Sequence, residues 1–191
     1  MAHVVVVLAQ GFEEMEAVAP IDLCRRAGLT VTVAGLTREV ISKRGLKVTC
    51  DVVLPSTVLS SSVNEGSLFD WDALVLPGGL PGANNLAASP AVQAMVDVGL
   101  SSRLVAAICA APSTVLGPTG RLRGRRWTGF PGTDNEAFGG TYLEDCVVVD
   151  GRLITSRAVA TAPEFALTLI GLLCGQSVAD RVARETLFMT P

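Results

Sequence analysis

The sequence predicts a doubly wound α/β fold, in which a mostly parallel sheet carries helices on both faces. Short apolar runs such as 4–9 and 73–76 are continuous rather than alternating, which is typical of strands buried on both faces. Segments of helical length separate these runs along the chain. No repeat, low-complexity block or linker interrupts this alternation, so residues 1–191 are expected to form a single domain.

The first half of the chain begins with a predicted strand at 4–9, a β-branched run that stops before Gly11. A helix is expected over 13–27, because its first turn is acidic and Gly28 occupies the usual stop position. Residues 29–35 are expected to form the second strand. The segments that follow are less regular, a hairpin or arm at 43–54 and a serine-rich surface loop or short helix at 56–67.

The second half continues the alternation. Strands are expected at 73–76 and 104–108, and helices at 90–100, in a short segment ending at 116, at 163–173 and from 177 onward. Residues 147–149 and 153–155 flank Asp150-Gly151, a dipeptide typical of the type I′ turn of a β-hairpin. The sequence therefore predicts a β-hairpin here, within a mostly parallel sheet.

The composition excludes several classes of protein. Hydrophobic residues make up 49% of the 191 residues and charged ones 17%, which excludes disorder as the main state. The net charge of −3 argues against a dedicated nucleic-acid binder, and no apolar run is long enough for a membrane span. Five cysteines without CxxC spacing and no recognisable signal peptide favour reduced thiols and a cytoplasmic location.

The sequence contains a single histidine, His3. Mechanisms of the Ser-His-Asp or Cys-His kind would have to use it, and most zinc sites need more imidazoles. We expect His3 to be an ordinary strand residue, and we expect neither a metal nor a cofactor.

Cys109 is the clearest candidate for chemistry. It follows the strand at 104–108 directly, at the edge where open parallel sheets bind ligands, with small residues on both sides. This layout resembles a nucleophile elbow, and the start of the next helix should lower the pKa of the thiol. A buried cysteine that only packs beneath the helix is the alternative, and this residue alone does not decide between them.

Two further features favour a functional Cys109. The Gly78-Gly79 turn would direct backbone N–H groups into an open site, where they and the N–H of Ala110 would form an oxyanion hole. A carboxyl group whose pKa is raised by burial can replace histidine in proton transfer. The carboxyl groups in the first loop and helix turn belong to Glu13, Glu14 and Glu16, two of which we expect to face solvent.

Several segments together resemble the ThiJ/PfpI superfamily, and within it the Parkinson-associated deglycase (DJ-one) branch with its bacterial relatives. They lie at 8–16, 25–28, 33–35, 75–79, 106–112, 155–157 and 164–166, in order and with compatible spacing. The resemblance implies a flavodoxin-like fold and a homodimer. It implies that Cys109 is reactive, that Glu16 touches the sulfur as a protonated hydrogen-bond donor, and that Gly79 and Ala110 supply oxyanion N–H groups.

The resemblance also implies an activity. The expected function is a cofactor-free glyoxalase III or protein deglycase, acting on methylglyoxal, glyoxal or their early glycation adducts on proteins, with a role in oxidative-stress defence. The alternative is a redox sensor or chaperone in which Cys109 oxidises to sulfinic acid with little turnover. A glutamine amidotransferase is excluded, because its catalytic histidine would have to lie downstream of the cysteine.

The chain departs from the family pattern at two places. Phe130 stands where many relatives have a histidine, so hydrolase chemistry of the Cys-His kind is not expected. The segment 128–131, Thr-Gly-Phe-Pro, resembles a bacterial sub-branch that carries the same residues. Residues 158–160 replace a Gly-Pro-Gly turn that is common in relatives.

Overall fold

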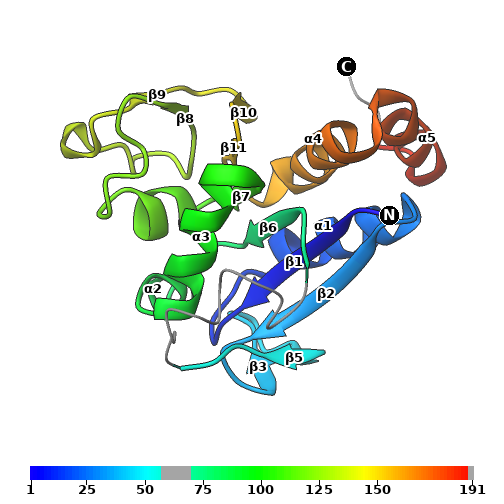
Figure 1. Cartoon of the computed structure of the whole chain (residues 1–191), viewed down its shortest axis with the longest axis horizontal. Helices are drawn as coiled ribbons and strands as arrows, with labels where there is room; N and C mark the ends of the chain where they lie inside the picture. The colour runs from blue at the N-terminus through cyan, green and yellow to red at the C-terminus, as the bar shows by residue number, and fades with distance from the viewer. Residues whose placement is uncertain (57–69, 189–191) are drawn as a thin grey trace.

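The computed structural model describes residues 1–56 and 70–188. Within these residues, the central sheet has seven strands in the order β10-β11-β7-β6-β1-β2-β5 (Figure 1). Its strands are β1 (His3–Leu8), β2 (Thr30–Gly35), β5 (Val52–Val53), β6 (Ala73–Leu76), β7 (Leu104–Ile108), β10 (Val147–Asp150) and β11 (Leu153–Ser156). Only the β10–β11 pair is antiparallel among the neighbours in this sheet. The predicted mostly parallel α/β fold with a β-hairpin is therefore confirmed, and the hairpin lies at one edge of the sheet.

Helices cover both faces of the sheet. On one face lie α1 (Glu14–Arg26), α4 (Ala162–Cys174) and α5 (Gln176–Thr186). On the other lie α2 (Gly82–Ala87), α3 (Pro90–Ser102) and the short helix η1 (Pro112–Leu116). Among the described residues, no helix has the length and apolar content needed to cross a membrane.

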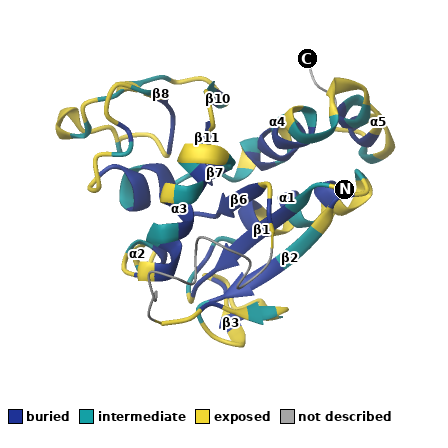
Figure 2. Ribbon diagram, viewed as in Figure 1, coloured by how far each residue is buried: buried dark blue, intermediate teal, exposed yellow. Residues whose placement is uncertain are grey.

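Strand β1 shows why its sequence is continuously apolar. Val4, Val6 and Leu8 contact the helices of the first face, whereas Val5 and Val7 contact those of the second. All five side chains have no solvent exposure, and Figure 2 shows the central strands in the colour of buried residues. A strand covered on both faces needs apolar residues at every position.

Several smaller elements lie outside the main sheet. A separate hairpin consists of β3 (Glu39–Ile41) and β4 (Lys47–Thr49), and β8 (Arg126–Trp127) pairs with β9 (Thr141–Tyr142). Single-turn helices η2 (Glu136–Phe138) and η3 (Val159–Thr161) complete the described elements. The hairpin predicted at 43–54 thus begins earlier, at residue 39, and β5 joins the main sheet. Most of the serine-rich segment predicted as a loop lies outside the described residues.

One sequence prediction about local structure is wrong, and one helix was not predicted. Asp150 pairs with Leu153, so the turn consists of Gly151 and Arg152, one residue later than expected. Gly151 has φ +59° whereas Arg152 has a negative φ, which excludes type I′ and matches type II′, where glycine takes the first central position. Helix α2 was not predicted, because Gly82–Ala87 is short and carries no amphipathic repeat.

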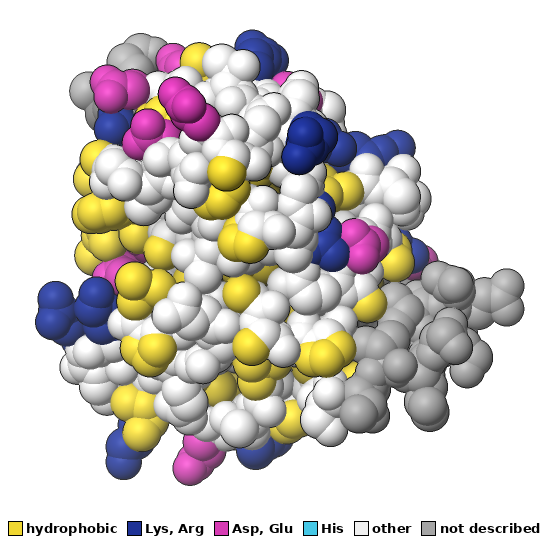
Figure 3. Space-filling view, turned by 90° about the vertical axis from the view of Figure 1, so that its left-hand side faces the viewer, with side chains coloured by type: hydrophobic (Ala, Val, Ile, Leu, Met, Phe, Trp, Pro, Cys, Tyr) yellow, Lys and Arg dark blue, Asp and Glu magenta, His cyan; other side chains and the backbone are white. Residues whose placement is uncertain are grey.

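The surface matches the low charge of the sequence. On the face shown in Figure 3, charged side chains lie mostly toward the margin, and the centre carries uncharged side chains with scattered apolar ones.

The packing of α4 on the sheet gives a stability test. Phe165 is fully buried in the core beneath α4, so Phe165→Ala leaves a cavity and should lower the free energy of unfolding by about 3–5 kcal/mol. Leu172→Ala on the same helix is the control, because this side chain is 49% exposed and its loss should cost less than about 0.5 kcal/mol. Urea denaturation measures both values. Equal losses in the two variants would contradict the packing described.

Candidate functional site

Three loops meet at the carboxyl edge of the sheet. Strands β1, β6 and β7 are parallel neighbours, so the loops that follow them leave the same edge. The chain runs from β1 outward through β2 to β5 and then returns to β6 on the opposite side of β1. Such a reversal of strand order opens a crevice, which is the usual ligand site of this fold class. Glu16 follows the first loop, Gly78 and Gly79 lie in the second, and Cys109 begins the third.

Cys109 has the strained backbone expected of a nucleophile elbow. Its φ of +62° lies in the left-handed region, which is uncommon for residues other than glycine. Two backbone hydrogen bonds hold it there: the N–H of Cys109 donates to the carbonyl of Ser156 at 3.0 Å, and its own carbonyl accepts from the N–H of Phe130 at 2.9 Å. Contacts with two other segments thus offset the backbone strain, which is about 1–3 kcal/mol for such a conformation.

Glu16 is a fully buried carboxyl group on the first turn of α1. Its Oε2 accepts a hydrogen bond from the N–H of Gly78 at 2.9 Å. A Cβ atom on Gly78 would come within 2.8 Å of both this oxygen and the Cβ of Cys109, so glycine is needed where the two side chains meet. The other oxygen, Oε1, is buried and has no donor of standard geometry among the described residues. A buried carboxylate with an unsatisfied oxygen is costly, which favours its protonated form.

The pKa values of the pair follow from this burial. Burial raises the pKa of Glu16 to about 7, and the nearby charge of Glu13 acts in the same direction. Burial also raises the pKa of Cys109 to about 12, and the negative charge of Glu16 and its hydrogen-bonding contact with the thiol add to the effect. At neutral pH the free protein therefore holds Cys109 as a thiol next to a partly ionised carboxyl group.

From the sequence, the start of the next helix was expected to lower the pKa of Cys109, whereas burial raises it. Desolvation outweighs the stabilising groups, since the sulfur lies in a largely apolar and half-buried place beside a second acidic group. The helix that was expected to lower the pKa is η1, which has only five residues and so a small dipole.

Two backbone N–H groups act on the sulfur in the opposite direction. Hydrogen bonds from the N–H groups of Gly79 and Ala110 lower the pKa of Cys109, although less than burial raises it. Gly79 has φ +82°, and a Cβ atom there would lie 2.6 Å from the nitrogen of Glu13, so the turn requires glycine. The structure thus brings together Cys109, Glu16, Gly79 and Ala110, the four residues proposed from the sequence.

The neighbouring acidic residues hold the framework. Glu13 caps α1, because its Oε2 accepts from the N–H of Glu16 at 3.0 Å. Glu14 accepts from the Ser42 hydroxyl and from the N–H of Arg44, which ties α1 to the β3–β4 hairpin. The sequence had suggested that two of the three glutamates face solvent, whereas Glu13 and Glu14 both accept hydrogen bonds within the protein. The contact of Gly78 with Glu16 was not predicted from the sequence, where the Gly-Gly pair was the available signal.

No imidazole lies at the site. His3 begins β1 at the opposite edge of the sheet, where its ring nitrogens contact the carbonyl of Asp70 and the hydroxyl of Thr32 at 2.7 and 2.8 Å. Within residues 1–56 and 70–188, no cluster of three or more His, Cys, Asp or Glu side chains is arranged to hold a metal ion. The carboxyl group of Glu16 is the acidic side chain that contacts the Cys109 thiol.

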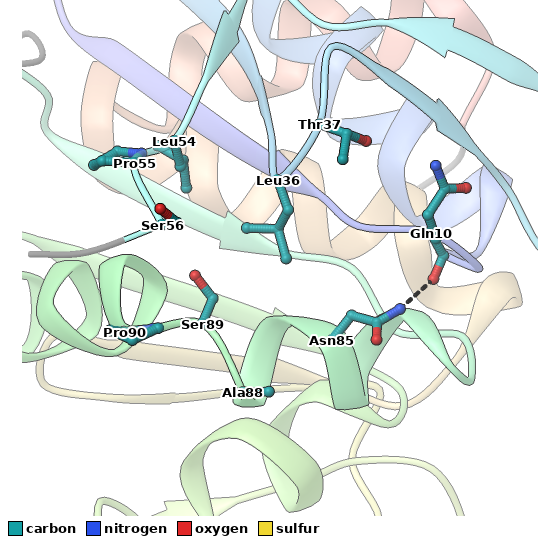
Figure 4. A pocket seen from close by; sticks show the side chains of 10 residues that line it. All are labelled: Gln10, Leu36, Thr37, Leu54, Pro55, Ser56, Asn85, Ala88, Ser89 and Pro90. Atoms are coloured by element: carbon teal, nitrogen blue, oxygen red, sulfur yellow. Dashed lines mark hydrogen bonds between the residues drawn. The ribbon is translucent and has the colours of Figure 1, made fainter.

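A cavity of about 390 Å³ lies at the same edge but apart from Cys109. Figure 4 shows its lining, which includes Leu36 and Leu54 on one side and Ser89 on the other. At one end, Asn85 Nδ2 donates to the carbonyl of Gln10 at 2.8 Å. None of the four candidate site residues lines it, so the chemistry described above does not depend on this cavity.

The raised pKa of Glu16 makes stability depend on pH. A carboxyl group whose pKa is about 7 in the folded protein and 4.5 otherwise stabilises the fold fully below pH 4.5, and this contribution is lost as pH rises to about 7. Glu16→Gln has no proton to lose, so its free energy of unfolding should rise relative to the natural protein between about pH 5 and about pH 8. Urea denaturation at the two pH values measures this difference. A difference that stays constant would contradict the raised pKa.

Comparison with known proteins places this geometry in a family. The family model described as the DJ-1/PfpI family matches residues 2–172. The Parkinson disease protein 7 homolog of Danio rerio is 41% identical over 182 residues, covering 93% of this chain and 92% of that protein. The glutathione-independent glyoxalase DJR-1.2 of Caenorhabditis elegans is 34% identical over 166 residues, covering 85% and 83%.

The fold leads to the same family. The solved structure of oxidized Toxoplasma gondii DJ-1 superimposes with a TM-score of 0.85 at 34% identity, covering 98% of each chain. The match in sequence thus extends over nearly the whole chain, and the match in structure includes the sheet and the helices on both of its faces. The chain belongs to the DJ-1/PfpI family and has its flavodoxin-like fold.

Proposed function

We propose that this protein is a cysteine-dependent, cofactor-free glyoxalase that converts methylglyoxal, glyoxal or related 2-oxoaldehydes to 2-hydroxyacids. Early glycation adducts of these aldehydes would be further substrates, which is the deglycase activity. The observation that carries the proposal is the buried Glu16 carboxyl group, with a pKa of about 7, against the Cys109 thiol and two backbone N–H groups. The relationship to a protein named as a glutathione-independent glyoxalase supports the same reaction.

The first step uses Glu16 as a base. Because Cys109 is a thiol at neutral pH, the ionised Glu16 takes the S–H proton as the sulfur attacks the aldehyde carbon. A C–S bond forms, and the electron pair of the C=O bond moves to oxygen. The N–H groups of Gly79 and Ala110 stabilise that oxygen anion. Protonated Glu16 then gives this proton to the oxygen anion, so the product is a neutral hemithioacetal and Glu16 is again ionised.

The second step moves a proton within the substrate. Glu16 transfers the proton on the former aldehyde carbon to the neighbouring carbonyl carbon, by way of an enediol. The aldehyde carbon becomes a thioester and the ketone becomes an alcohol, so one carbon is oxidised as the other is reduced. Water then cleaves the C–S bond, releases the hydroxyacid and returns the proton to Cys109. A group with a pKa of about 7 can both take and give protons at neutral pH.

Substitution of the two central side chains tests this mechanism. Cys109→Ser should abolish lactate formation from methylglyoxal, and Glu16→Gln should lower kcat by roughly 10² to 10⁴. In the natural protein, kcat/KM should rise with pH through about 7, because the base form of Glu16 starts the reaction. Cys146→Ser, at an exposed cysteine, is the control that should keep full activity. Undiminished lactate formation by Cys109→Ser would refute the mechanism.

A redox sensor or chaperone is the second candidate, favoured by the description of the related Toxoplasma gondii structure as oxidized. In this role two equivalents of peroxide would convert the Cys109 thiol to sulfinic acid and yield two waters.

Mass spectrometry after mild peroxide treatment, run beside the lactate assay, separates the two roles. The enzyme proposal expects lactate formation from untreated protein and its loss as Cys109 gains oxygen. Gain of two oxygens at Cys109 before exposed Cys146 reacts, with negligible lactate formation from untreated protein, would favour the sensor.

A further inference from the structure

We infer that Leu80 and Phe130 form an apolar rim at the Cys109 site, which selects 2-oxoaldehydes that carry an apolar group on the ketone carbon over unsubstituted glyoxal. This inference rests on the proposed function and names its preferred substrate class. The phrase "apolar rim" refers below to these two side chains only.

The backbone of Phe130 is hydrogen-bonded to the backbone of the reactive residue, Cys109. Its N–H donates to the carbonyl of Cys109 at 2.9 Å. The preceding residue is Gly129, where a Cβ atom would lie 3.2 Å from that carbonyl oxygen and 3.3 Å from the ring of Trp127. Glycine therefore lets this loop approach Cys109 closely. The Phe130 side chain is 48% exposed, so about half of this large apolar side chain faces solvent.

Leu80 belongs to a different segment, the turn that follows β6. It follows Gly79, whose N–H acts on the Cys109 sulfur, and its side chain is 49% exposed. The turn is fixed by two backbone hydrogen bonds: the N–H of Glu13 donates to the carbonyl of Gly78 at 3.0 Å, and the N–H of Ala83 donates to that of Gly79 at 2.8 Å. A second partly exposed apolar residue thus follows, in the sequence, the residue that supplies an oxyanion N–H group.

The loop that carries Phe130 is ordered by its own contacts. The carbonyl of Phe130 accepts from the N–H and the hydroxyl of Thr133, at 3.1 and 2.6 Å. The carbonyl of Gly129 accepts from the hydroxyl of Tyr142 at 3.1 Å. A side chain on a loop fixed in this way loses little further freedom when a ligand covers it, which favours binding.

The division of the site into polar and apolar parts sets the preference. Glu16 and the two N–H groups interact with the reacting carbonyl groups of the substrate. The substituent on the ketone carbon is therefore contacted by other parts of the site. At the mouth of the site these include the apolar rim. A methyl or phenyl substituent would bury apolar surface there, whereas glyoxal has only hydrogen at that position. One additional methylene group in an apolar pocket changes kcat/KM by about 10- to 200-fold.

The test compares kcat/KM for glyoxal, methylglyoxal and phenylglyoxal. The natural protein should prefer phenylglyoxal, and Phe130→Ala should lower the ratio of phenylglyoxal to glyoxal by roughly 10-fold. Leu80→Ala should lower it in the same direction. Leu172→Ala is the matched control, since this leucine is also 49% exposed but lies on α4, and its ratio should not change. A ratio that is unchanged in both rim variants overturns the inference.

A second measurement does not require turnover. The rates at which N-benzyl- and N-methyl-chloroacetamide alkylate Cys109 give the same apolar preference, and Phe130→Ala should lower their ratio. If the natural protein converts none of the three aldehydes but this ratio falls, the proposed function fails and the apolar rim stands. If turnover occurs and neither ratio responds to Phe130→Ala, the glyoxalase stands and the rim is refuted.

Discussion

The contact between the buried carboxyl group of Glu16 and the thiol of Cys109 is the interaction on which the site depends. Two acidic groups that share one desolvated place cannot easily both be ionised, so the pKa values of both rise. The consequence is a division of roles. In the proposed mechanism, the group with the pKa of about 7 holds the charge and moves the proton, and the sulfur becomes a nucleophile as it gives its proton away.

In the proposed mechanism this arrangement takes the place of a histidine. In a Cys-His pair, an imidazolium ion stabilises a resting thiolate. Here burial instead raises the pKa of a carboxyl group to about 7, and in the proposed mechanism this group serves as both acid and base. The backbone supplies the remaining groups, because Gly79 and Ala110 direct their N–H groups at the reacting sulfur. Phe130 fits this scheme, since the site requires no imidazole at that position.

The glycines at the site show how tightly its parts are packed. Gly78 separates Glu16 from Cys109, and Gly79 passes against the loop that precedes α1, each at distances that leave no room for a Cβ atom. The strained turn at Cys109 is held by Ser156 and Phe130, which come from segments far away in the sequence. The reactive geometry is therefore a product of three converging loops and two flanking segments rather than of a single motif.

The sequence by itself determined the parallel sheet, because continuous apolar runs such as 4–9 have few alternatives to strands buried on both faces. It also identified Cys109, Glu16, Gly79 and Ala110 as candidates, since residues that follow parallel strands share one edge and the family resemblance specified which of them to choose. Only the tertiary structure decided the ionisation of Cys109. The pKa of a thiol depends on how completely the surrounding loops exclude water and on the charge that they place beside it, and neither quantity is encoded in the local sequence.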